Sequence, residues 1–162
     1  MVSQPWSQDA DLVLWTLLLA EDLNAAALER LQREHPAIRY AHGFLFQQLV
    51  DGPRPVGVLA AALGVTSQAI SKASRELERL GYVERTRDGG DRRVHRIALT
   101  AKGRAAVRAG GEIRAELNRE LEQALGPERA RTAARTLRAA LAARGAMALG
   151  SGPAQELSSR RR

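Results

Sequence analysis

Apolar side chains recur three or four positions apart along most of the chain, the spacing that places them on one face of an α-helix. Pro36 and Pro55 suit the first position of a helix, Gly64 suits a helix end, and Thr66 suits an N-cap. The pattern predicts six helices, over residues 7–34, 36–50, 55–63, 67–80, 100–125 and 127–147.

The period changes between residues 82 and 99. Residues 82–87 and 93–99 have the composition of two strands around a glycine-rich turn at residues 88–92, and His95, Ile97 and Leu99 share one strand face. We therefore expect a mainly α fold with a small β-hairpin, in which two short helices precede the hairpin.

The two helices before the hairpin have the pattern of a helix-turn-helix, with a glycine at the turn and a hydroxyl at the second cap. The second helix has an apolar seam of Ile70, Ala73 and Leu77. Short or flexible hydrogen-bonding groups that can enter a DNA major groove occupy the opposite face: Ser67, Gln68, Ser71, Lys72 and Arg75. An ordinary amphipathic helix with a polar solvent face is the alternative.

Charge is distributed unevenly over the 162 residues, whose net charge is +7. Residues 66–108 hold 11 basic and 5 acidic side chains, whereas residues 1–65 carry a net charge of −3. A segregated basic block indicates a polyanion partner, although solvated surface arginines give the same composition. The hairpin favours DNA, because it concentrates arginines that can lie along a backbone or enter a minor groove: Arg85, Arg87, Arg92, Arg93 and Arg96.

Several other function classes lack support in the sequence. There is no cysteine, which excludes disulfides and thiol chemistry. His35, His42 and His95 do not have the spacing of a metal site, and we expect His95 to pack under the hairpin. We find no phosphate-binding loop or nucleophile elbow, so we expect no enzyme and no cofactor. The longest apolar run, residues 12–20, is too short to cross a membrane, and we expect a cytoplasmic protein that is nucleoid-associated when bound to DNA.

Residues 56–104 resemble the winged-helix core of MarR-type transcriptional regulators. The similarity is carried by Leu63-Gly64-Val65-Thr66, by Leu77-Glu78-Arg79-Leu80-Gly81-Tyr82, and by a wing signature. That signature, D-x-R followed by L-T, is met by Asp91, Arg93, Leu99 and Thr100. Ala73 and Ser74 stand where the family often has larger apolar residues, which predicts looser packing behind the second helix.

The resemblance implies a winged helix-turn-helix fold and a homodimer that binds double-stranded DNA. The implied organisation is an N-terminal dimerisation helix at 1–35, a DNA-binding domain at 36–104, C-terminal dimerisation helices at 105–148 and a disordered basic tail at 149–162. Arg93 would enter the minor groove, Asp91 would orient arginines, and Arg92 would meet a phosphate. The predicted DNA-binding residues are Thr66, Ser67, Gln68, Ser71, Lys72, Arg75, Arg87, Asp91, Arg92 and Arg93.

Many such regulators also bind a small organic effector. Trp15, Tyr40 and Phe44 are the bulky residues of the first two helices that would line such a cleft, and the alternative is that they are core aromatics. The predicted function is a dimeric, sequence-specific regulator, a repressor of a palindromic operator that an effector releases. The competing hypotheses are a sequence-tolerant architectural DNA-binding protein and a winged helix that contacts only proteins.

Overall fold

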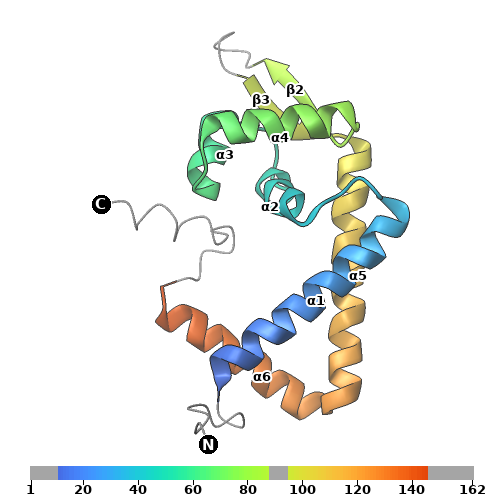
Figure 1. The fold of residues 1–162 in the computed structure, drawn as a ribbon, viewed down its shortest axis with the longest axis vertical. Coiled ribbons are helices and arrows are strands. Elements are labelled where there is room, and N and C mark those ends of the chain that lie inside the picture. Colours follow the sequence, from blue (N-terminus) through green and yellow to red (C-terminus); the bar gives the residue numbers. More distant parts are fainter. Residues whose placement is uncertain (1–10, 88–94, 146–162) are drawn as a thin grey trace, which may run out of the picture.

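A computed structural model of the chain describes residues 11–87 and 95–145. Helices α2 to α4 and a small sheet form a winged-helix unit at one end, residues 40–99, and three long helices extend from it (Figure 1). We call these three helices, α1, α5 and α6, the helical arms. The elements are α1 (Leu12–Glu34), α2 (Tyr40–Leu49), β1 (Arg54–Pro55), α3 (Val56–Leu63), α4 (Ser67–Arg79), β2 (Val83–Arg87), β3 (His95–Leu99), α5 (Ala101–Leu125) and α6 (Pro127–Ala143).

The predicted mainly α fold with a β-hairpin is confirmed, and the starts of α1, α2 and α3 differ from the prediction. α1 begins at Leu12, because the Asp11 carboxylate accepts the Leu14 N–H at 2.9 Å and acts as the N-cap. α2 begins at Tyr40 rather than at Pro36. The extended backbone of Arg39 interrupts the helical path, and its N–H donates to Nδ1 of His42 at 3.2 Å.

A third strand, β1, was not predicted. Its residues Arg54 and Pro55 pair with Ile97 and Arg96, so the antiparallel sheet has the order β1-β3-β2. Two residues are too few to show the alternation that marks a strand in a sequence. Pro55 consequently serves as the N-cap of α3, and not as its first residue.

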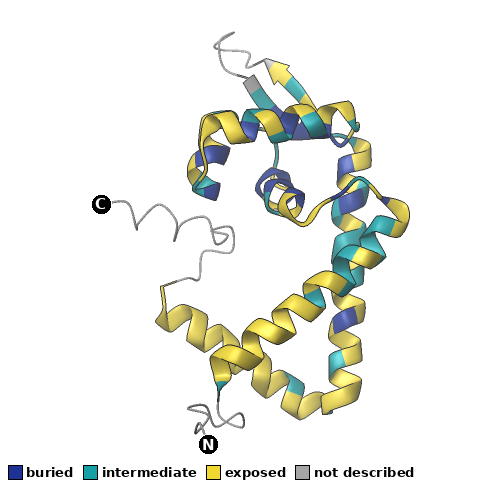
Figure 2. Ribbon diagram, viewed as in Figure 1, coloured by how far each residue is buried: buried dark blue, intermediate teal, exposed yellow. Residues whose placement is uncertain are grey.

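The hydrophobic core lies in the winged-helix unit. Leu59, Leu77 and Ile97 are fully buried, and they come from α3, α4 and β3. Burial of one such side chain stabilises the fold by roughly 1.5–3 kcal/mol. Neither α1 nor α6 has a buried residue among those described, and Figure 2 shows this contrast between the two ends of the molecule.

Candidate nucleic-acid interface

The turn between α3 and α4 sets the direction of the second helix. Gly64 adopts the left-handed conformation (φ 63°, ψ 30°), and its N–H donates to carbonyls of the last turn of α3. Thr66 then caps α4, because its hydroxyl accepts the Ala69 N–H at 3.1 Å. The two helices meet at 111°, within the range of a helix-turn-helix. The predicted turn and cap are therefore confirmed.

Among the described helices none is by itself long and apolar enough to cross a membrane. α3 and α4 reach that length and composition only when they are taken together across their 111° bend. Their apolar side chains Leu59, Ile70 and Leu77 are buried in the core of the winged-helix unit.

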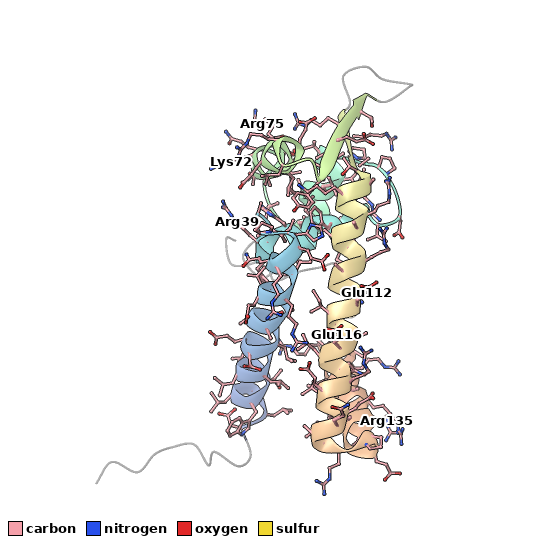
Figure 3. All side chains as sticks on the ribbon, turned by 90° about the vertical axis from the view of Figure 1, so that its right-hand side faces the viewer. Arg39, Lys72, Arg75, Glu112, Glu116 and Arg135 are labelled. Carbon is pink, nitrogen blue, oxygen red and sulfur yellow. The ribbon has the colours of Figure 1, made fainter. Side chains whose placement is uncertain are left out.

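α4 has one buried face and one polar, accessible face. Gln68, Lys72 and Arg75 are exposed, and Lys72 and Arg75 project from the outer side of the winged-helix unit in Figure 3. Thr66 and Ser67 are exposed at the start of the helix, and Ser71 is half-buried. The structure thus brings together on one surface all six residues that the sequence predicts for α4, the second helix of the helix-turn-helix, which we call the recognition helix.

The buried face of α4 differs from the predicted seam at one position. Ser74 is fully buried beside Ile70 and Leu77, whereas Ala73 is half-buried. The Ser74 hydroxyl donates to the Ser71 carbonyl at 3.3 Å and accepts from Nη2 of Arg85 at 3.1 Å. Ser74, where we expected looser packing, is fully buried and hydrogen-bonded to the Arg85 side chain.

The position of Arg85 corrects the prediction, which counted this residue among the hairpin arginines that face DNA. Its guanidinium turns inward, with Nε buried without a hydrogen-bond partner and 4.0 Å from the Glu78 carboxylate. The alternation of β2 carries the signal for this, because Arg85 lies two residues after the buried Val83 and shares its strand face. Arg85 therefore joins the hairpin to the recognition helix instead of facing a ligand.

Among the other predicted hairpin arginines, Arg96 is half-buried on β3, opposite Thr86 of β2 and Pro55 of β1. β2 and β3 pair in register from Val83↔Leu99 to Arg87↔His95. The tip with Asp91, Arg92 and Arg93, and the side chains of Arg87 and His95, lie outside the described residues. Their predicted roles remain predictions.

An ion pair that the sequence analysis missed connects α2 with the recognition helix. Arg39, just before α2, contacts the Glu76 carboxylate at 3.1 Å, and His42 is buried beside this pair. Burial lowers the pKa of His42, the nearby Arg39 lowers it further, and Glu76 opposes the shift. Because Arg39 and Glu76 are far apart in the sequence, no pattern of local spacing predicts that they pair.

The three aromatic residues predicted to bind an effector fall into two places within one chain. Tyr40 and Phe44 pack edge to face on α2, with ring centroids 5.2 Å apart. Trp15 lies near the opposite end of α1, where it lines a groove of 730 Å³ between α1 and α6. A single intrachain cavity does not collect all three.

Comparison with known proteins supports the MarR resemblance. The model of the MarR family matches residues 42–94, which span α2 to the hairpin. None of the curated protein sequences matches the chain.

Solved structures extend the similarity to the whole fold. MepR of Staphylococcus aureus, a transcription regulator of the multidrug efflux pump MepA, has a TM-score of 0.68 at 22% identity, over 82% of this chain and 97% of that one. YusO of Bacillus subtilis has a TM-score of 0.66 at 23% identity, over 86% and 99%. A MepR variant bound to an oligodeoxyribonucleotide has a TM-score of 0.58 at 24% identity, over 81% and 96%. The resemblance to the MarR family is thus shown by the family model over residues 42–94, in a chain that has the winged-helix fold of MarR-type transcription regulators.

Proposed function

We propose that this protein is a dimeric transcription regulator that binds double-stranded DNA sequence-specifically through α4. One observation carries the proposal: α4 presents Gln68, Lys72 and Arg75 to solvent while Ile70, Ser74 and Leu77 fix its other face to the core. A helix held in this way can insert rigidly into a major groove, where Gln can pair with adenine and Lys or Arg with guanine or phosphate.

The charge of the same region supports DNA as the partner. Residues 66–108 carry the densest positive charge of the chain, and Lys72 and Arg75 lie on the accessible face of α4. In this proposal Arg87, Arg92 and Arg93 anchor the wing to phosphates or to the minor groove, and Asp91 orients them. The location that we expect, in the cytoplasm and on the nucleoid, follows from this partner.

The exposed apolar surface of the arms supports a homodimer. Leu12, Val13 and Leu17 of α1 expose more than half of their surface, and Leu141 of α6 exposes 48%. Exposed apolar area of this kind marks an interaction surface. We propose that a second copy covers it, in an interface of ~2,000 Å² or more about a two-fold axis, which gives a palindromic operator its two half-sites.

Repression and release by a small organic effector are the finer part of the proposal. Tyr40 and Phe44 present aromatic surface next to Arg39, whose Glu76 partner belongs to the recognition helix. A ligand at this position would act directly on the orientation of α4. Trp15 contributes to an effector site only if the dimer brings it to a cavity of the partner.

The alternative function is a sequence-tolerant architectural DNA-binding protein. DNA selected by the purified protein gives a cognate duplex, and titration against a scrambled duplex gives the ratio of the two affinities. We expect a ratio of ~10³ or more for a regulator. A ratio near one would establish the architectural role instead.

The salt dependence and the wing provide a second test of DNA binding. If two subunits neutralise roughly six to ten phosphates, log affinity falls against log salt with a slope near −0.9 per contact. Arg93→Ala should weaken cognate and scrambled binding alike and reduce that slope. A wild-type slope shallower than about −2 would show that the basic block is not the binding surface.

A further inference from the structure

The turn that follows the recognition helix, residues 80–82, is bound by the first turn of α5. Its three consecutive carbonyl groups are all hydrogen-bonded: Leu80 to the Lys102 ammonium at 2.9 Å, Gly81 to the Thr100 hydroxyl at 2.7 Å, and Tyr82 to the Thr100 N–H at 3.1 Å. Gly103 packs so closely on this turn that an added Cβ would clash with the Tyr82 carbonyl. The turn that ends α4 is therefore tightly packed against the start of α5 and hydrogen-bonded to it.

The side chain of Tyr82 extends the same connection to α1. It is 1% exposed, and its hydroxyl lies 3.2 Å from Nδ1 of His35, the residue that ends α1. Burial raises the pKa of Tyr82, and its hydroxyl donates to Nδ1 in the His35 tautomer that carries the proton on Nε2. The ring also packs on Phe46 of the core and lies under the Lys102 ammonium at 4.3 Å.

An ion pair also joins α1 to α5. The Arg30 guanidinium of α1 binds both carboxylate oxygens of Glu120 on α5 at 2.8 and 3.0 Å, and the two helices diverge toward the start of α1 in Figure 1. Arg30 also lies 3.6 Å from Glu116, one turn earlier on α5. The 80–82 turn, itself part of the winged-helix unit, therefore joins two bodies, that unit and the pair of helices α1 and α5.

We infer that Tyr82 and His35 are positioning residues that fix the angle between α1 and the recognition helix. In the dimer, that angle sets the distance between the two copies of α4 and hence the spacing of the half-sites. The α5 side of the turn is held through three backbone carbonyls, whereas the α1 side is held by the hydrogen bond of the Tyr82 hydroxyl and by an edge-to-face contact between the Tyr82 and His35 rings, with centroids 5.6 Å apart. The predicted effect on half-site spacing rests on the proposed function, whereas the effect on the angle does not.

The angle can be measured without DNA, and the chain has no cysteine that would compete for labels. Spin labels at Asn24→Cys on α1 and Arg79→Cys on α4, both exposed, report the distance between the two bodies by pulsed EPR. Labelled chains are diluted with unlabelled ones so that distances within one chain dominate. We expect a narrow distribution for the labelled parent and a broader one after Tyr82→Phe, which keeps the ring and removes only the hydroxyl. Equal widths would overturn the inference whatever the protein binds.

The DNA measurement uses palindromes whose half-sites are moved apart by single base pairs, each a step of about 3.4 Å and about 34°. We expect the parent to favour one spacing sharply, and Tyr82→Phe to reduce that preference by a factor of about 2–10, the effect of one hydrogen bond. His35→Asn, which keeps an acceptor, should retain the preference, and His35→Leu should reduce it at least as much as Tyr82→Phe does.

A control separates positioning from simple loss of stability. Leu59→Val shortens a fully buried core side chain of α3 and lowers stability without touching the turn, so it should leave the spacing preference unchanged. A Tyr82→Phe protein with the parental spacing preference would contradict the inference while leaving the regulator proposal intact. A parent that binds no selected duplex would overturn the proposed function, and the EPR widths would still decide the angle.

Discussion

The winged-helix unit and the helical arms are built on opposite principles. The unit buries Leu59, Leu77 and Ile97 completely within one chain, so its fold is determined by its own core. The arms have no buried residue in α1 or α6, and α1 exposes a run of large apolar side chains from Leu12 to Leu19.

This difference separates the tasks that we propose for the two regions. A surface that touches DNA needs a rigid support, which the unit supplies from within. A surface that binds a second copy need not be buried in the single chain, because the partner buries it. The comparison therefore predicts that substitutions in the arms affect assembly, whereas substitutions in the unit affect folding or DNA binding.

The largest effect is expected at the apolar surface of α1. Leu17→Glu puts a charge into the proposed interface, where an unpaired buried carboxylate costs several kcal/mol, so the protein should become monomeric at micromolar concentration. Light scattering measures the mass. The control Gln47→Glu adds the same charge at an exposed position of α2 and should remain dimeric. A parent that is monomeric would refute the proposed assembly.

The next effect distinguishes two glycines of the same helix. Gly103→Ala should destabilise the protein by about 3 kcal/mol, because its Cβ collides with the Tyr82 carbonyl, a backbone atom that cannot move aside. In Gly110→Ala the Cβ meets nothing within 4 Å, and the gain in helix propensity should stabilise by about 0.5–1 kcal/mol. Urea unfolding measures both. Equal effects would mean that α5 is not seated on the 80–82 turn.

A smaller effect is expected where the hairpin joins the recognition helix. Arg85→Ala removes the charged donor to the buried Ser74 hydroxyl, which keeps only its bond to the Ser71 carbonyl, and should cost about 1–3 kcal/mol. Arg79, the last residue of α4, is exposed, and its replacement by alanine should lower the free energy of unfolding by no more than about 0.5 kcal/mol. Thermal unfolding of both variants decides whether Arg85 is structural, and an unchanged Arg85→Ala would return it to the set of DNA-facing arginines.

The sequence predicts the helices well because their periodicity is long and their caps are explicit. Thr66 and Thr100 occupy the predicted caps, and Gly64 ends α3 as expected. The prediction is wrong where a tertiary contact overrides a local sequence preference. Pro36 permits a helix start, but Ile38 is drawn into the core and its carbonyl accepts from Gln32 at 2.7 Å, so α2 begins later.

The candidate site likewise has one part that the sequence predicts and another part that it does not. The polar face of α4 follows from helical spacing, and the structure exposes it as predicted, except that Ser71 is half-buried. Composition alone could not show that Arg85 turns inward, because its partner Ser74 looks like a surface residue until the helix is placed on the sheet. The contacts of Arg39 with Glu76 and of His35 with Tyr82 join separate elements, and periodicity within one element cannot predict them.

Binding of Gln68→Ala to a cognate and a scrambled duplex tests the central claim, that α4 determines DNA sequence preference, most directly. Gln68 lies on the exposed face near the start of α4, and Gln47→Ala, on α2, is the matched control. We predict a loss of roughly 1–3 kcal/mol on the cognate duplex, little change on the scrambled one, and no change on either for the control. An equal loss of affinity on both duplexes would contradict the claim that this face of α4 contacts base edges.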